Sequence, residues 1–114
     1  MTARTMTSAE FLNAQALAMT EKDLLEQCRN AAKTLGLLLY HTYSSRRSEP
    51  GFPDLVIVGR RGVLIRELKR QRGTVTPAQH TWLNALDDTG IDADVWRPAQ
   101  LIDGTVLDQM RAVR

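Results

Sequence analysis

Hydrophobic positions change their spacing along the chain, and each change predicts a new element. Apolar residues at helical spacing follow Thr20, and Gly36 ends this pattern, which predicts a helix with Thr20 as its N-cap. The apolar run 37–43 predicts a buried strand. A weaker helical pattern near the N-terminus predicts either a short helix that Ser8 caps or a mobile extension.

Two β-branched runs in the middle of the chain, 55–58 and 63–66, predict a β-hairpin. A four-residue turn with glycine at both ends, residues 59–62, separates the runs. Antiparallel pairing brings the start of the first strand opposite the end of the second. Because Asp54 stands at that start and Glu67 at that end, we expect the two carboxylates to lie close together.

Lys69 belongs to the same group, because side chains alternate along a strand and Lys69 therefore shares a face with Glu67. Two carboxylates a few ångströms apart repel each other, and a fold that keeps both ionised supplies a cation between them. Oxygen ligands, completed by water and phosphate oxygens, suit Mg²⁺ or Mn²⁺. Lys69 beside such an ion can serve an attacking water and neutralise charge in the transition state. The sequence leaves open whether Lys69 is a base or a fixed cation.

The second half of the chain predicts two helices and a strand. Thr76 as N-cap and Gln79 at N3, with proline at the first helical position, form a capping box that opens a helix over 76–88. The alternating run 91–96 predicts a strand, and a terminal helix is expected from Thr105 onward. Gln79 thus has a structural explanation before any functional one is considered.

This order of elements predicts an α/β fold with a mixed sheet flanked by helices. The hairpin strands are antiparallel, whereas a crossover through the helix 76–88 makes the strand 91–96 parallel to its predecessor. At 114 residues the chain is long enough for one domain. We assign residues 1–19 to an N-terminal extension and residues 20–114 to this domain.

Taken in order, these residues resemble a known nuclease family. Pro53-Asp54 followed by Glu67-Leu68-Lys69 resembles the PD-(D/E)xK signature, and the longer set of motifs resembles the stand-alone VRR-NUC branch of that superfamily. The motifs are His41-Thr42, Ser45-Arg46-Arg47-Ser48, Gly51-Phe52-Pro53-Asp54-Leu55, Glu67-Leu68-Lys69, Gln79, Trp82-Leu83 and Val95-Trp96-Arg97-Pro98. The resemblance implies a restriction-endonuclease-like core.

The resemblance also implies a role for individual residues. The implied metal ligands for Mg²⁺ or Mn²⁺ are Asp54, Glu67 and the backbone carbonyl of Leu68, and the implied catalytic residues are Asp54, Glu67, Lys69 and Gln79. Gln79 would then face the active site in addition to capping its helix. Glu21, at the start of the helix after Thr20, is a further candidate ligand, although a carboxylate in that position also complements the helix dipole.

The loop before Asp54 is the expected phosphate contact. It carries Ser45, Arg46, Arg47 and Ser48. Guanidinium forks beside hydroxyl donors suit phosphate binding, although an arginine pair in a loop is also common on ordinary solvated surfaces. Basic residues, Arg66 among them, are dense between positions 46 and 72, while the formal net charge of the chain is only +2. We therefore expect the positive charge to gather around the site.

Cysteine content and hydropathy bear on where the protein works. Cys28 is the single cysteine, so no disulfide can form within the chain, as is usual in a reducing cytoplasm. No apolar run approaches the ~20 residues that cross a membrane, and the N-terminus lacks the apolar core of a secretory signal. We expect a cytoplasmic protein of a bacterium or a phage-infected cell, without a membrane partner.

The sequence therefore predicts an enzyme, a DNA endonuclease that depends on Mg²⁺ or Mn²⁺. The resemblance implies DNA repair, recombination or phage replication, with flaps and four-way (Holliday) junctions as candidate substrates. A chain of this length lacks room for a separate sequence-reading domain, so we expect structure-selective cutting, for which a homodimer would be a natural arrangement. The alternative is a non-catalytic nucleic-acid-binding domain of the same fold. An ordinary surface ion pair between Glu67 and Lys69 would leave Asp54 unexplained.

Overall fold

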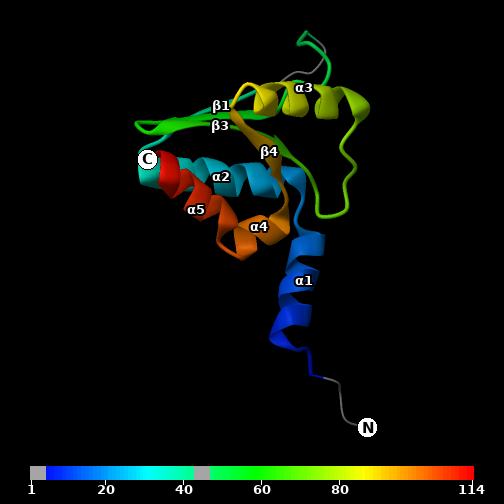
Figure 1. Ribbon diagram of the computed structural model, residues 1–114. Coiled ribbons are helices and arrows are strands. Elements are labelled where there is room, and N and C mark those ends of the chain that lie inside the picture. Colours follow the sequence, from blue (N-terminus) through cyan, green and yellow to red (C-terminus); the bar gives the residue numbers. More distant parts are fainter. Residues whose placement is uncertain (1–4, 43–46) are drawn as a thin grey trace.

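A mixed four-stranded sheet in the order β1-β2-β3-β4 lies at the centre of the protein (Figure 1). The computed structural model describes residues 5–42 and 47–114. Along the described chain the elements are α1 (Ser8–Ala18), α2 (Glu21–Leu35), β1 (Leu38–His41), β2 (Leu55–Gly59), β3 (Gly62–Leu68), α3 (Pro77–Asp88), β4 (Asp92–Trp96), α4 (Pro98–Ile102) and α5 (Thr105–Val113). β1, β2 and β3 pair antiparallel, and β4 is parallel to β3. The predicted α/β class and mixed sheet are confirmed.

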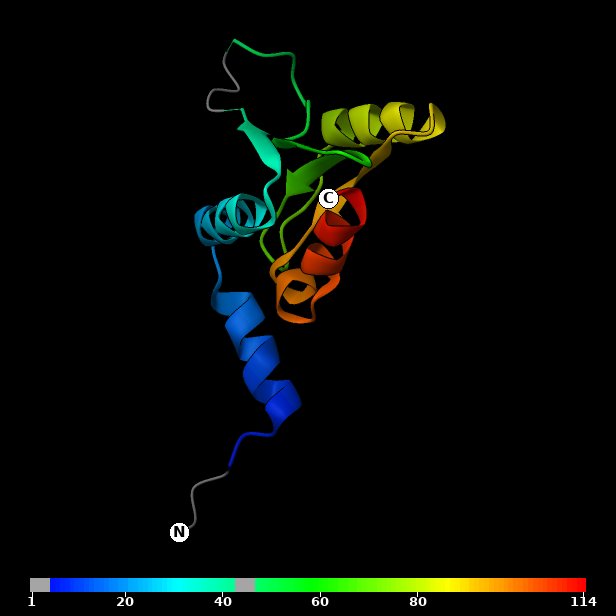
Figure 2. The same ribbon diagram turned by 90° about the vertical axis from the view of Figure 1, so that its left-hand side faces the viewer.

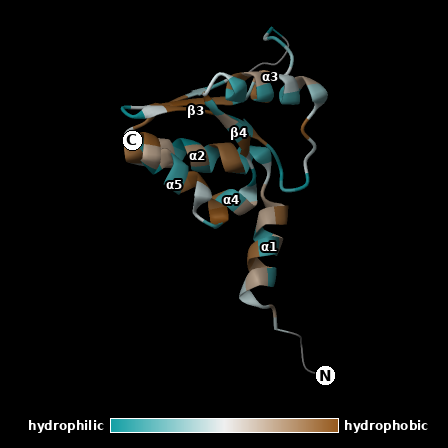
Figure 3. Ribbon diagram, viewed as in Figure 1, coloured by the Kyte–Doolittle hydropathy of each residue, from teal (hydrophilic) through white to brown (hydrophobic). Residues whose placement is uncertain are grey.

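Helices cover the two faces of the sheet unequally (Figures 1 and 2). α2 and α5 pack on one face, and the large core between them and the sheet contains Leu24, Cys28, Ala32, Leu37, Leu55, Ile57, Leu64, Leu68, Trp96, Val106, Met110 and Val113. α3 packs on the other face, where the small core contains Ile65, Leu83 and Ala93. The hydropathy colouring of Figure 3 shows the same concentration of apolar residues in the central strands. The predicted alternation along β3 thus turns its side chains toward two separate cores.

The hairpin turn is docked on the end of α5. Gly59 pairs with Gly62, so the loop between them contains two residues. A Cβ at Gly59 would collide with the carbonyl of Val113, which explains the glycine. The N–H of Arg61 donates to that same carbonyl at 3.0 Å. The predicted hairpin is confirmed, and its turn is held by tertiary contacts as well as by local geometry.

The ends of α2 and α3 follow the predicted caps. Thr20 and Asp23 exchange reciprocal hydrogen bonds of 3.0 and 3.1 Å at the start of α2. Gly36 closes that helix in the left-handed region, with φ +71°. Thr76 and Gln79 form the second capping box, and α3 begins at the following proline. These local hydrogen bonds fix where both helices begin, and therefore where their first turns stand against the sheet.

α1 and β1 differ from their predictions. The N-cap of α1 is Thr7 rather than Ser8, because the Thr7 hydroxyl accepts the N–H of Glu10 at 3.1 Å. The predicted buried strand is in fact the exposed edge strand β1, in which Leu38 and Tyr40 are 73% and 63% exposed. The reason is tertiary, since α3 lies over β3 and β4 and leaves the same face of β1 uncovered.

Sequence signals are weak for α1 and α4, the two helices at the edge of the fold. α4 was not predicted, because a five-residue helix gives too short a pattern to detect. α1 projects away from the body of the protein and packs against α4 (Figure 2). Its Phe11 and Leu12 are largely exposed. Among residues 5–42 and 47–114, no helix is both long and apolar enough to cross a membrane.

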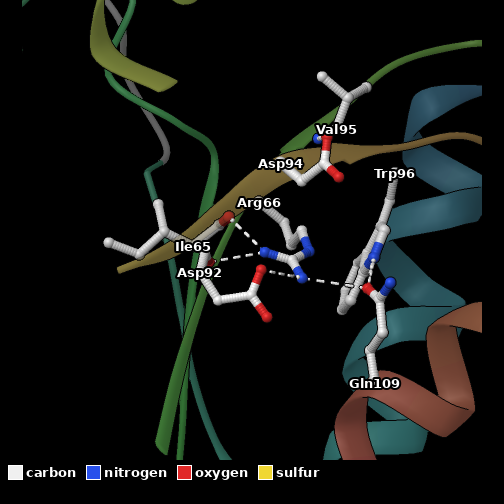
Figure 4. Close-up of polar contacts among 7 residues, drawn as sticks. All are labelled: Ile65, Arg66, Asp92, Asp94, Val95, Trp96 and Gln109. Carbon is white, nitrogen blue, oxygen red and sulfur yellow. Dashed lines mark hydrogen bonds and ion pairs between the residues drawn. The ribbon is translucent and has the colours of Figure 1, made fainter. Parts of the chain in front are cut away.

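Arg66 links β3 to β4 from inside the large core (Figure 4). Its guanidinium is 1% exposed and donates to the carbonyl and carboxylate oxygens of Asp92 at 2.7 and 2.8 Å. It also donates to Gln109 Oε1 at 3.1 Å and lies 5.1 Å from the centre of the Trp96 ring. Arg66 does not add to the positive charge expected around the site, because alternation along β3 turns it into the core.

Candidate active site

The open end of the β2-β3 hairpin brings three charged side chains together. Leu55 pairs with Arg66, so Asp54 and Glu67 stand opposite each other one residue further along the same register. The N–H of Leu68 donates to Asp54 Oδ2 at 2.9 Å, and this bond fixes the carboxylate against β3. Lys69 Nζ lies 4.0 Å from Glu67 Oε1, with its side chain 12% exposed. The convergence expected from the strand pattern is therefore present.

Gln79 reaches the same group from α3. Its Nε2 donates to Glu67 Oε1 at 3.0 Å, while its Oε1 accepts the N–H of Thr76 at 2.9 Å. One amide therefore closes the capping box and holds the carboxylate. Glu67 is only 3% exposed, so the hydrogen bond from Gln79 Nε2 also gives this buried carboxylate a partner that it could not obtain from water. Gln79 thus caps α3 and also contacts Glu67, and its catalytic role stays a prediction.

The segment before Asp54 is anchored to α3. Gly51 has φ +88°, and a Cβ there would collide with the backbone of Ala78, so only glycine suits this approach. The rings of Phe52 and Trp82 meet edge to face, with centroids 5.2 Å apart and an interplanar angle of 79°. Pro53 is fully buried. These contacts fix the backbone on which Asp54 is carried.

Burial and like charge dominate the electrostatics of the site. The pKa of Glu67 is raised to about 8, and burial is the largest cause. The charge of Asp54, a hydrogen bond between Glu67 and Asp54, and the charge of Glu21 act in the same direction, whereas the charge of Lys69 lowers the pKa. Without a further cation, Glu67 is therefore largely protonated at neutral pH. A divalent cation between the carboxylates would favour the charged form of both.

The donor set fits such a cation. Asp54 and Glu67 offer carboxylate oxygens. The N–H of Leu68 donates to Asp54, and because the N–H and carbonyl of one strand residue face the same side, we expect the Leu68 carbonyl to face Asp54 as well. Oxygen-only ligation of this kind suits Mg²⁺ or Mn²⁺. Within the described parts of the chain, no group of three or more His, Cys, Asp or Glu side chains could hold a metal ion. The expected ligand set of two carboxylates and one carbonyl therefore stays a prediction.

A cavity of about 230 Å³ opens beside Asp54. Its walls are Glu21, Lys22, Leu25, His41, Asp54 and Leu68. These residues come from the start of α2, from β1 and from the open end of the hairpin. The cavity suits a hydrated ion with a phosphate group better than a drug-sized ligand, which needs at least ~300 Å³.

Comparison with known proteins identifies the family of this fold and site. The model of the VRR-NUC domain family matches residues 2–100. The chain belongs to the VRR-NUC family, whose members are nuclease-type domains. A solved structure titled "VRR_NUC domain" is similar to it, with a TM-score of 0.64 and 21% sequence identity over 77% of this chain and 96% of that chain. That likeness shows a shared fold. No curated protein matches.

Glu21 occupies a peripheral place in this VRR-NUC site. It is the first residue of α2 and is exposed, and it lines the cavity beside Asp54. It acts on Glu67 through charge. Among the described residues it does not complete a three-carboxylate cluster with Asp54 and Glu67. Its expected role as a further ligand therefore stays a prediction.

The predicted phosphate loop is only partly described. Ser45 and Arg46 lie outside the described residues. Arg47 and Ser48 are exposed in the irregular segment that leads to Gly51 and Asp54. Their position ahead of the anchored segment is consistent with the expected contact, and their role stays a prediction.

Two further residues near the VRR-NUC site were missed from sequence. Lys22 lines the cavity, and its place beside Glu21 at the start of α2 was the available signal. Arg97 Nη1 donates to the carbonyls of Arg70, Gln71 and Gly73 at 2.8, 3.3 and 2.7 Å. It thereby holds the loop that follows Lys69. No local pattern marks this role, because tertiary folding alone brings these carbonyls to Arg97.

Proposed function

We propose that this VRR-NUC domain is a metal-dependent DNA endonuclease that hydrolyses phosphodiester bonds. The observation that carries the proposal is the grouping of Asp54, Glu67 and Lys69 at one end of the hairpin, with the Leu68 N–H and Gln79 holding the carboxylates. An ordinary surface ion pair between Glu67 and Lys69 would not require Glu67 to be buried. It would also not require the hydrogen bonds from the Leu68 N–H to Asp54 and from Gln79 to Glu67.

Asp54, Glu67 and the Leu68 carbonyl would hold Mg²⁺ or Mn²⁺. When bound, such an ion polarises the phosphate and makes a water molecule more acidic. Lys69 Nζ, held beside Glu67, orients the attacking water and stabilises the negative charge that grows on the phosphoryl oxygens. Gln79 keeps the Glu67 carboxylate in one orientation throughout. Glu21 is proposed as an outer acidic group, reached through water.

Phosphates of the substrate would be held around this site by basic and hydroxyl side chains. The proposed contacts are Ser45, Arg46, Arg47 and Ser48 before β2. Arg70 and Arg72, both exposed directly after Lys69, lie on the loop that Arg97 holds. Such contacts bind DNA without reading its sequence. We therefore propose structure-selective cutting of branched DNA, in repair, recombination or phage replication.

A two-fold homodimer would allow paired cuts in a branched substrate. Its proposed interface is the open face of β1, β2 and the start of β3, called here the open sheet face, which consists of Leu38, Tyr40, Val58 and Val63. These side chains are between 38% and 73% exposed. An apolar surface of this kind on an edge strand is more often covered by a partner than left in water.

The deciding experiment is cleavage of a labelled panel of duplex, single-stranded, flap and four-way-junction DNA with Mg²⁺, with Mn²⁺ and with chelator. Asp54→Asn should abolish metal-dependent cutting, whereas Asp88→Asn, an isosteric change at the exposed end of α3, should leave it intact. Lys69→Met should lower the cutting rate by roughly 10²–10⁴-fold with binding retained. Binding of the panel without any cutting would instead indicate the non-catalytic alternative.

A further inference from the structure

A second basic site lies at the opposite end of the hairpin from Asp54. A cavity of about 680 Å³ opens there, called here the arginine cavity, and its walls are Arg60, Arg61, Arg111, Arg114 and residues 35–37. Three segments that are distant in sequence meet at this point: the end of α2, the hairpin turn and the end of α5. Figure 1 shows them together beside the label of the C-terminus.

Ion pairs within the described structure do not balance the positive charge of these four arginines. Arg60, Arg61 and Arg114 are exposed and make no ion pair within the described residues, and Arg111 contacts Asp108 at 3.5 Å with both side chains largely in solvent. No carboxylate side chain lines the cavity. The ends of α2 and α5 contribute roughly half a negative charge each, and a terminal carboxylate adds at most one more. With Asp108 set against Arg111 as well, the four guanidiniums leave an excess of at least about one positive charge.

The chemistry of the lining selects the kind of anion. Arginine presents a planar fork that matches two phosphate oxygens at once. None of the residues that line this cavity is aromatic, so nothing in it would stack on a base, as binders of single strands do. The residues 35–37 offer backbone and two leucines, which carry no sequence-reading donors. The cavity therefore suits a phosphate backbone rather than a base.

We propose that the arginine cavity binds backbone phosphates of duplex DNA, as a second contact remote from the cleaved bond. This inference rests on the proposed function. From Gly62 to Glu67, β3 advances by five residues, or about 17 Å. That length equals about five base pairs along one strand. A duplex arm held by the arginine cavity therefore extends at least this far from the active site.

The test compares Arg60→Gln with Arg61→Gln, as a double variant, against Arg29→Gln with Lys33→Gln. Both change the net charge by the same amount, and the control pair is exposed on α2 outside either cavity. The Arg61 N–H to Val113 bond belongs to the backbone, so the turn keeps its fold. All proteins carry Asp54→Asn, and duplex binding is measured by anisotropy in chelator, so the readout does not depend on cleavage.

Loss of two phosphate contacts should lower the slope of log K against log salt by about 1.8. From 50 to 200 mM salt the parent should then lose about twelvefold more affinity than the arginine variant, since 4 raised to 1.8 is about 12. The control pair should keep the parent slope. Equal slopes in both double variants would overturn the inference while leaving the cleavage panel to decide the proposed function.

A second arm separates DNA from free phosphate. Inorganic phosphate is titrated into the same proteins, and thermal stabilisation is recorded. Duplex binding that weakens in the Arg60 and Arg61 variant supports the inference. If that variant loses only its response to inorganic phosphate, with duplex binding unchanged, the cavity is a small-anion site and the inference is wrong.

Discussion

Gln79 performs two tasks with one amide, and substitution can separate them. Gln79→Glu keeps the capping box, because glutamate at N3 accepts the same N–H from Thr76. It removes the donor to Glu67 and places a second carboxylate there, so metal-dependent cutting should fall by roughly 10–100-fold with α3 intact.

Thr76→Ala is the matched control for that change. It removes the hydroxyl that accepts the Gln79 N–H, at a cost of about 1 kcal/mol in the free energy of unfolding, but leaves the Gln79 contact with Glu67. Below the melting transition its cutting rate should match the parent. Equal losses of rate in the two variants, measured at the same temperature, would mean that Gln79 acts only through the helix.

Glu67 should make the metal-free protein less stable as pH rises. Its pKa is about 8 in the folded state and 4.5 ordinarily, so the folded state holds this proton more tightly than the unfolded one. The resulting stability is fully present below pH 4.5 and is lost progressively as pH rises to about 8. Glu67→Gln should remove this decline, which melting curves in chelator between pH 5 and 9 can follow. An unchanged decline in the variant would assign it to other groups.

At the scale of single residues, the sequence identified the groups that strand geometry controls. Asp54, Glu67 and Lys69 could be grouped because register and alternation follow from the chain itself. The role of Arg97 could not be predicted, because the three carbonyls that accept its hydrogen bonds belong to residues 70–73, which are distant from Arg97 in sequence. The burial of Arg66 was missed for a different reason: alternation places Arg66 on one face with Leu64 and Leu68, yet it was counted with the basic residues expected around the site.

At the scale of elements, the approach of the 51–53 segment to α3 can be tested with two glycines. Gly51 and Gly90 have φ +88° and +90°, so alanine at either position should cost about 1–2 kcal/mol of backbone strain. A Cβ at Gly90 meets open space, whereas one at Gly51 collides with Ala78. Gly51→Ala should therefore cost about 1–3 kcal/mol more and also reduce cutting.

Chemical denaturation gives both free energies of unfolding, and the cleavage assay gives the second readout. Gly90→Ala should lose stability without losing cutting in native buffer. If Gly51→Ala behaved like Gly90→Ala in both measurements, the anchoring of Asp54 through α3 would not matter for the site.

Elements with strong local patterns were predictable, and those defined by their neighbours were not. The hairpin, α2 and α3 carry β-branched runs or capping boxes that act within a few residues. The exposure of β1 depends on the length and position of α3, which no pattern within 37–43 reveals. The short α4 packs on α1 and α5, and its local signals, Pro98 at its first position and Gln100 accepting the Arg97 N–H at 2.9 Å, stand within only five residues.

At the scale of the whole molecule, the open sheet face predicts self-association. Leu38→Glu with Tyr40→Glu should lower the mass in solution from dimer to monomer, because charge at the centre of an apolar contact is costly. Ile91→Glu is the control, since Ile91 is also exposed but stands beside β4, at the other edge of the sheet. Analytical ultracentrifugation distinguishes the outcomes, and a monomeric parent protein would contradict the dimer.

The register that the Gly59–Gly62 pair sets also determines where the chain can tolerate insertions. Glu67 and Arg66 are adjacent on β3 but face opposite sides, one toward Gln79 and one into the large core. Inserting a single codon between Gly62 and Arg66 would exchange these faces, placing a carboxylate in the core and a guanidinium in the active site. Insertions within the two-residue turn leave the faces unchanged. Length variation among descendants of this gene should therefore gather in the turn and be absent from β3.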